Sequence, residues 1–144
     1  MFGFITRYGG DCVVPIKEFP VGATPVVRST PVVLANGVIG AGAANSTAFV
    51  GVANGTDGDN VEVILGLEDV VFIADYIGST KTTLAAADVG SAFGLDITGK
   101  NIDLDNPETT GATSFDAPWV VVGYDNNNAK ALVKLKAAAR QAVI

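Results

Sequence analysis

The chain has 144 residues, of which 49% are hydrophobic and only 17% charged, and its formal net charge is −6. This length suits one domain with a sizeable core, and the many Gly, Ala, Val and Thr residues favour short strands over a helical bundle. The acidic balance argues against nucleic acid as a partner, and the apolar stretches are too short to cross a membrane.

The N-terminal residues 1–24 are predicted to form an arm and edge segment, followed by a single β domain over residues 25–144. Phe2, Phe4 and Tyr8 lie close to flexible glycines, a pattern typical of an arm that packs on its own domain or on a neighbour. We expect these aromatic residues to anchor the arm on a partner, and deletion of residues 1–11 to leave the fold intact.

Regularly spaced prolines punctuate the next segment. They bracket strand candidates at Cys12–Ile16 and Val26–Arg28, and because proline removes a ladder donor, these are expected to be extended pieces or edges. Asn36-Gly37 between apolar runs predicts a hairpin. Alternating patterns over 47–53 and 61–65 predict two further strands.

The second half of the chain continues this rhythm. A strand over 70–77 is followed by residues 80–88, which could form one helical turn or an ordered loop. Short strands are expected at 92–97 and 101–105. The strongest pattern is a hairpin of Trp119–Tyr124 and Ala131–Leu135 around a polar turn.

Turns recur roughly every ten residues, a spacing typical of a sandwich or barrel. The predicted fold class is therefore all-β, or mainly β with one short helix, as a small β-barrel or β-sandwich with an extended N-terminal arm. We expect Trp119 to lie in its core, because aromatic side chains at alternating strand positions are usually buried.

No residue pattern indicates catalysis. The chain has no histidine, and its single cysteine, Cys12, allows no intrachain disulfide. Acidic clusters at 57–60 and 103–106 resemble parts of calcium loops but lack the distal glutamate. We expect no enzyme activity, no catalytic residues, no concave polar pocket, no metal ligands and no cofactor.

Basic residues gather at the C-terminal end, where residues 130–144 contain four Lys or Arg residues and no acid. The other five basic residues of the chain face all fifteen acidic ones. This pattern fits a solubilised last strand, or subunit docking in which Lys134, Lys136 and Arg140 meet an acidic face of a neighbouring copy.

Several short motifs occur in a characteristic order along the second half: Val89-Gly90, Phe93-Gly94-Leu95, Ile102–Asp105, Thr109–Gly111, Val120–Asp125 and Leu132–Leu135. Over residues 45–135 the chain resembles the small head decoration, or cement, proteins of tailed bacteriophages. The resemblance implies a β-barrel-like domain without catalytic residues.

The resemblance also implies a function. The protein would be a structural virion protein, made in the host cytoplasm, that binds the major capsid protein on the capsid exterior and stabilises contacts between capsomers. Phe2, Phe4 and Tyr8 would contact the capsid, and the protein would act as a homo-oligomer, a dimer or trimer. Two alternatives stay open: a surface adhesion or carbohydrate-binding module with an exposed Trp119, and a self-assembling capsid or tail-tube protein.

Overall fold

The computed structural model describes residues 2–7 and 15–141, without the side chains of residues 4–7 and 57. Within this part the fold is all-β and no helix reaches seven residues. The elements are β1 (Phe2–Arg7), β2 (Ile16–Pro20), β3 (Pro31–Ala35), β4 (Val38–Ala41), β5 (Gly51–Asp57), β6 (Asn60–Leu65), β7 (Val70–Ile77), η1 (Ala86–Asp88), β8 (Ala92–Leu95), β9 (Ile102–Pro107), β10 (Trp119–Asp125), β11 (Lys130–Leu135) and η2 (Ala137–Ala139).

Strands β7 to β11 form a closed sheet, here called the C-terminal barrel. Its order is β7-β11-β10-β8-β9, and a short parallel pairing of Tyr76 and Ile77 in β7 with Ile102 and Asp103 in β9 returns the sheet to β7. Strand β1 pairs antiparallel with the first half of β7 and extends the sheet by one strand. Closure leaves few free edges on this barrel.

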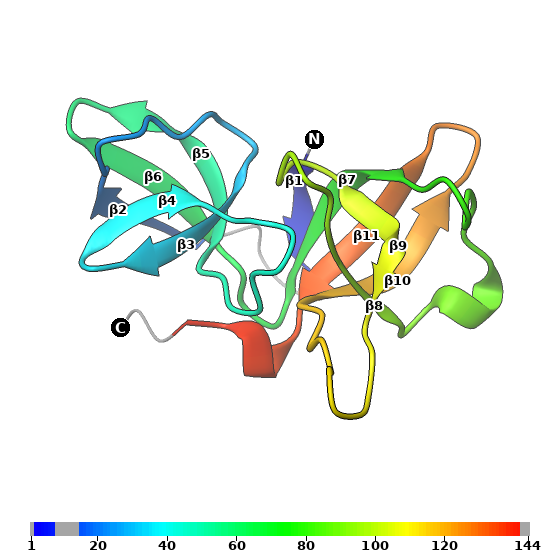
Figure 1. The fold of residues 1–144 in the computed structure, drawn as a ribbon. Coiled ribbons are helices and arrows are strands. Elements are labelled where there is room, and N and C mark those ends of the chain that lie inside the picture. Colours follow the sequence, from blue (N-terminus) through cyan, green and yellow to red (C-terminus); the bar gives the residue numbers. More distant parts are fainter. Residues whose placement is uncertain (1, 8–14, 142–144) are drawn as a thin grey trace.

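Strands β2 to β6 form a second sheet, the N-terminal barrel, in the order β2-β6-β5-β3-β4. A parallel bridge between Val21, just after β2, and Ile39 in β4 closes it. The hairpin β3–β4 turns at Asn36 and Gly37, which both have positive φ (52° and 81°), as that turn requires. Figure 1 shows the two barrels side by side, with β1 at the junction between them.

The two barrels have the same topology. In each, the first strand pairs antiparallel with the fifth and parallel with the third, and the second strand pairs with the third and the fourth. Local detail agrees as well: the Ser29 N–H donates to the Ala53 carbonyl (2.7 Å), and the Gly90 N–H donates to the Val121 carbonyl (2.8 Å). Ser29 and Gly90 both have positive φ, 69° and 95°. The described chain is thus a tandem pair of five-stranded barrels.

The main core lies where the barrels meet. Trp119 is fully buried, as expected from the sequence, and its ring centroid lies 4.9 Å from Phe2, 5.3 Å from Phe49 and 6.0 Å from Phe72. These rings come from β1, from the N-terminal barrel's approach to β5, and from β7. Two barrels therefore share one apolar cluster, while a smaller cluster fills the N-terminal barrel alone.

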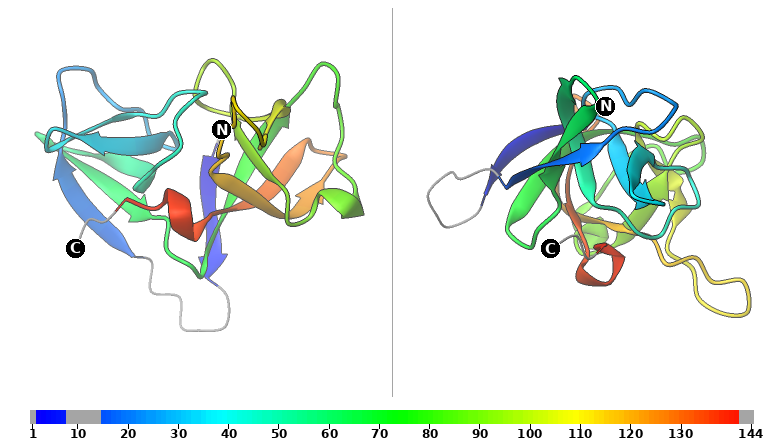
Figure 2. Two further views of the ribbon diagram at one scale, coloured as in Figure 1. Left: turned by 60° about the horizontal axis from the view of Figure 1, so that its bottom comes forward. Right: turned by 90° about the vertical axis from the view of Figure 1, so that its left-hand side faces the viewer.

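The end of the chain returns to the N-terminal barrel. After β11, the 3-10 turn η2 leads to a parallel bridge between Arg140 and Phe49. The Gln141 side chain then exchanges two hydrogen bonds with the backbone of Leu34 (2.8 and 3.0 Å). Figure 2 shows this segment running beneath the junction. The C-terminal segment thus ties the barrels together.

The all-β prediction is confirmed, with η1 as the single helical turn within the segment 80–88. The predicted division at residue 24 instead falls inside the N-terminal barrel, because β2 pairs along the whole of β6. Residues 2–7 and 16–20 are edge strands of the two sheets rather than a projecting arm. Their placement in the sheets follows from long-range pairing that a local pattern does not report.

Candidate functional site

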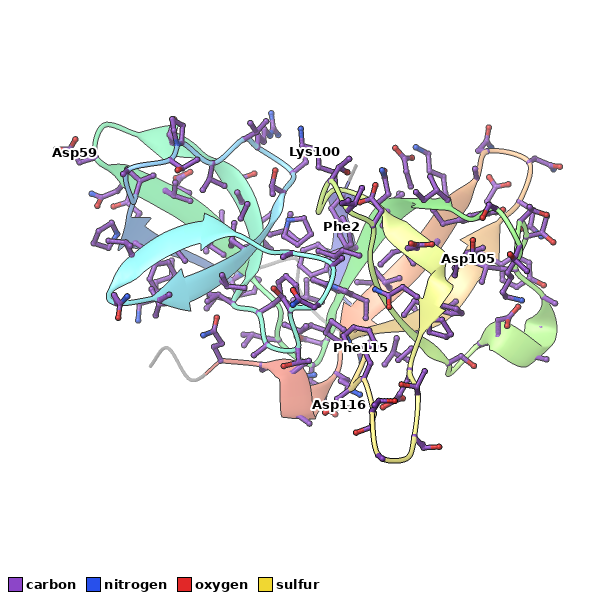
Figure 3. The ribbon with its side chains drawn as sticks, in the orientation of Figure 1. Phe2, Asp59, Lys100, Asp105, Phe115 and Asp116 are labelled. Atoms are coloured by element: carbon purple, nitrogen blue, oxygen red, sulfur yellow. The ribbon has the colours of Figure 1, made fainter. Side chains whose placement is uncertain are left out.

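The predicted capsid-contact residues fall in three situations. Phe2 is 2% exposed and packs on Trp119, so in this structure its side chain offers no surface to a partner. Phe4 pairs in register with Phe72, and its side chain is not described. Tyr8 lies outside the described residues. Of the two options for the arm, Phe2 adopts packing on its own domain, as Figure 3 shows at the junction; contact with a capsid stays a prediction.

The predicted docking lysines and arginine are largely engaged within the chain. The Lys136 ammonium donates to Glu108 (2.9 Å) and Asp116 (2.5 Å), carboxylates at the two ends of the loop between β9 and β10. Burial alone would lower the pKa of Lys136, but the hydrogen bonds that Lys136 donates to Asp116 and Glu108 outweigh it and raise the pKa. Lys136 therefore fastens the loop that projects from the C-terminal barrel in Figure 2.

The other two basic residues differ. Arg140 donates from Nε and Nη2 to the carbonyl of Leu135 (3.3 and 3.1 Å), which fixes the turn after β11. Lys134 is half-buried on β11 and has no ion pair within the described residues. Subunit docking through these residues stays a prediction.

One carboxylate of the acidic clusters, Asp105, organises a loop. Asp105 accepts hydrogen bonds from the backbone N–H groups of Ser79, Thr80 and Lys81 and from the Ser79 hydroxyl (2.6–3.1 Å). These N–H groups, that of Lys81 foremost, hold the pKa of Asp105 far below its usual range. Asp105 thereby ties β9 to the segment after β7. Within the described residues, no group of three or more potential ligands is arranged to hold a metal ion.

Among the described residues, Asp96 is the one buried carboxylate, at 4% exposure. It accepts bonds from the Thr98 hydroxyl, the backbone of Lys100 and Asn101, and the Asn101 amide (2.8–3.1 Å). Burial would raise the pKa of Asp96, but the bonds from Asn101 and Thr98 outweigh it and lower the pKa. The result is a rigid tip between β8 and β9 that carries Ile97 at 95% exposure.

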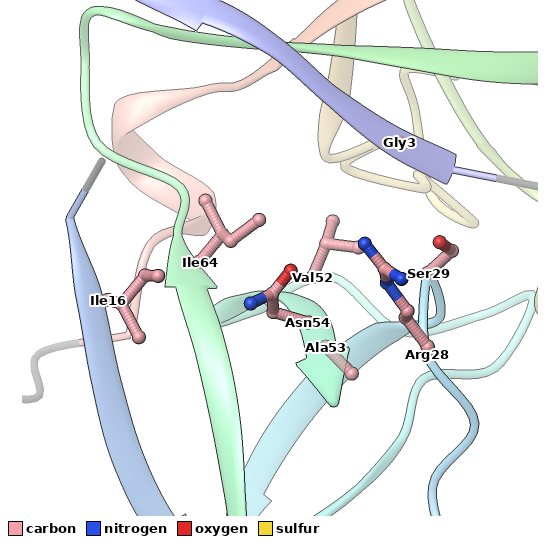
Figure 4. A pocket seen from close by; sticks show the side chains of 8 residues that line it. All are labelled: Gly3, Ile16, Arg28, Ser29, Val52, Ala53, Asn54 and Ile64. Atoms are coloured by element: carbon pink, nitrogen blue, oxygen red, sulfur yellow. The ribbon is translucent and has the colours of Figure 1, made fainter. Parts of the chain in front are cut away.

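A cavity of about 530 Å³ lies between the barrels beneath β1. Figure 4 shows Gly3 of β1 above it, Ile16 and Ile64 toward one end, and Arg28 and Ser29 toward the other. Val52, Ala53 and Asn54 complete its lining, in which Arg28 is the one ionisable side chain among the described residues. The expectation of no concave pocket with polar walls is thus not met, although the lining pairs no acid with a base.

Seven large hydrophobic side chains among the described residues are at least a third exposed. They lie mainly at strand ends and loops: Ile16, Val27, Leu67, Ile77, Val89, Ile97 and Tyr124. Singly exposed residues are normal on soluble proteins. Unlike the other exposed hydrophobic residues, Ile16 lies on an open strand edge and lines the cavity.

Comparison with known proteins gave no match to any family model, curated protein or solved structure. Over the described residues, no helix has the length and apolar character needed to cross a membrane.

Sequence reasoning missed two features of the site. The cavity depends on the contact between two barrels, which no local pattern reports. The strand β2 was not predicted, because the sequence candidate ended at Ile16, and the importance of its open edge follows from the duplication of the barrel.

Proposed function

We propose that the protein is a structural virion protein that binds the outside of a capsid lattice and stabilises contacts between capsomers. The observation that supports it best is how the polar groups are used. Asp96, Asp105 and Lys136 are each engaged in internal hydrogen bonds that fasten loops to the barrels. The described surface presents an open strand edge, exposed apolar side chains in loops and few charged groups to a partner.

Such a surface is suited to binding another protein at many equivalent sites on a shell. A stable protein interface buries about 1,600 Å² in total, and many equivalent copies add their binding free energies across a shell. Main-chain hydrogen bonds and apolar contacts involve little desolvation of charge, which burial would penalise. Two barrels with a shared core and a returning C-terminal segment provide the rigidity that a clamp between capsomers requires.

The carbohydrate-binding alternative finds no support at its predicted platform, because Trp119 is fully buried. The self-assembly alternative and the decoration proposal predict different behaviour when the purified protein is concentrated. A decoration protein stays a monomer or small oligomer in solution, whereas a tube or shell protein polymerises alone. Light scattering during concentration distinguishes the two.

The direct test is sedimentation with empty heads of the virus that encodes the chain. Purified protein is mixed with unexpanded and with expanded heads, and the bound fraction is measured by pelleting. We expect saturable binding at a fixed ratio of copies to capsomers on expanded heads, together with a higher temperature of head disruption. Binding to neither form would refute the proposal.

A further inference from the structure

The duplication of the barrel exposes a difference between its two copies. In the C-terminal barrel, β1 covers the outer edge of the first strand, β7. In the N-terminal barrel, the first strand, β2, is the last strand of its sheet. One position in the repeated architecture is therefore filled by a strand in one barrel and open in the other.

Residue equivalence follows from the parallel closures. Val21 and Tyr76 each form the parallel pair with the third strand of their barrel. Counting back along the strands makes Ile16 equivalent to Val71, and Glu18 equivalent to Ile73.

Hydrogen-bond alternation identifies which main-chain groups point outward. The carbonyl of Pro15 and the N–H of Val21 both bond toward β6 and the turn before it (2.8 and 3.0 Å). Because alternate residues of a strand face opposite neighbours, residues 17 and 19 also face β6, while Ile16 and Glu18 direct their N–H and C=O groups to the open side. No hydrogen bond to these four groups occurs among the described residues.

The same alternation on β7 shows what fills the equivalent position. The Tyr76 N–H donates to Ala129 (3.1 Å) toward β11, so Val71 and Ile73 face the other way. They are paired there with Thr6 and Gly3 of β1. A short antiparallel strand is therefore sufficient to occupy an edge of this length.

We infer that the outer edge of β2 at Ile16 and Glu18 is a docking site for an extended, antiparallel segment of a partner protein, which adds a strand as β1 does on β7. Addition of a strand to an exposed edge is a common mode of peptide recognition. Identification of the partner as the capsid protein rests on the proposed function; the docking site itself does not.

The charged residues of β2 disfavour pairing between the β2 edges of two copies of the chain. Antiparallel pairing of β2 with itself, using its outward groups, sets Lys17 opposite Lys17 or Glu18 opposite Glu18. Like charges directly opposite each other are destabilising. The edge instead fits a segment with a basic residue opposite Glu18 and an apolar residue near Ile16, which is 45% exposed.

Pro20 and the two charged residues are also features that protect edges from indiscriminate pairing. Pro20 lacks an N–H, so the outward N–H donors of β2 are those of Ile16 and Glu18. These features therefore set specificity for a complementary strand.

The test uses Glu18→Pro in the full chain. This change removes the outward N–H and blocks strand addition, while the bonds to β6 come from residues 17, 19 and 21 and are kept. Glu18→Ala, which keeps the N–H, is the matched control. Unchanged thermal unfolding and Trp119 emission verify that both variants are folded.

Two probes separate this inference from the proposed function: expanded empty heads, and eight-residue peptides selected for binding from a random displayed library. Against both, we expect Glu18→Pro to weaken binding at least about tenfold and Glu18→Ala to keep affinity within about threefold. If Glu18→Pro binds heads as tightly as the wild type, the docking site on β2 is refuted and the proposed function stands. If the wild type binds a selected peptide but no heads, the proposed function is refuted and the docking site stands.

Hydrogen exchange on the wild type gives a test that needs no variant. In the free protein, the Glu18 amide is expected to exchange rapidly and the Ile73 amide slowly, since β1 protects only the second. A bound peptide should slow exchange at Ile16 and Glu18. A Glu18 amide that is already protected, the lack of any selected peptide, or bound peptides that leave Glu18 unprotected would each overturn the inference.

Discussion

At the scale of single residues, the two barrels differ most where their equivalent positions meet the shared core. Pairing with the last strand of each barrel makes Gly51 equivalent to Trp119: Gly51 is opposite Leu65, and Trp119 is opposite Leu135. At this position the C-terminal barrel contributes the largest side chain of the core, and the N-terminal barrel contributes no side chain. The repeated topology thus accommodates different packing.

Gly51 is predicted to tolerate no side chain. A Cβ at this position would lie 1.9 Å from the carbonyl oxygen of Ile64, so Gly51→Ala must displace backbone. We expect a loss of about 1–3 kcal/mol or more in unfolding free energy, measured by urea denaturation. Gly55→Ala in the same strand is the control, since nothing lies within 4 Å of its added Cβ. Equal effects at both positions would contradict the steric argument.

Asp105 is predicted to stabilise the fold in a pH-dependent way. Its pKa is depressed in the folded protein by backbone N–H donors, so its contribution is fully present above the unfolded pKa of about 3.9 and declines as the pH falls below it. Asp105→Asn should lower the unfolding midpoint at pH 7, and the difference from wild type should shrink at pH 3. A difference that is constant with pH would show that the carboxylate charge is not responsible.

At the scale of elements, β1 is held by pairing with β7 and by the buried side chain of Phe2. Phe2→Ala removes the ring beside Trp119, the only tryptophan of the chain. A buried Phe→Ala change costs up to about 3–5 kcal/mol, and here we expect local release of β1 with a red shift of tryptophan emission. Ile97→Ala, at a 95% exposed side chain, is the control and should leave emission unchanged.

The same contact corrects the expectation for the N-terminal deletion. Removal of residues 1–11 takes away Phe2 and uncovers the edge of β7, so the fold is not expected to stay intact. A loss of capsid binding by such a truncation would not distinguish a missing contact from a damaged core.

Local patterns predicted the strands from β3 onward because each carries its own alternation and turn signals, as the β3–β4 and β10–β11 hairpins show. The strand predicted at Val26–Arg28 is absent from the described structure, and β2 was not predicted. The placement of β1 on β7 could not be predicted, since these strands lie far apart in sequence. The duplication was hidden because equivalent positions hold unlike residues, such as Lys17 and Phe72. Charge pattern alone could not tell that Lys136 binds the loop of its own chain between β9 and β10.

At the scale of the whole molecule, the shared cluster makes the two barrels one folding unit. Phe49, Val52 and Ile64 of the N-terminal barrel belong to the same buried cluster as the core of the C-terminal barrel. The C-terminal segment adds main-chain contacts across the junction at Phe49 and Arg140. A clamp between capsomers has to transmit load between its two ends, and this junction is where that load would pass.

We therefore predict that wild-type protein unfolds in one transition. Tryptophan emission, which reports the junction, and far-UV circular dichroism, which reports all strands, should give coincident denaturation curves. Phe49→Ala removes a fully buried ring 5.3 Å from Trp119 and should separate the two curves. Val63→Ala, a truncation in the core of the N-terminal barrel alone, should lower the midpoint but keep the curves together. Two resolved transitions in the wild type would show that the barrels are independent, and the proposed rigid clamp would lose its physical basis.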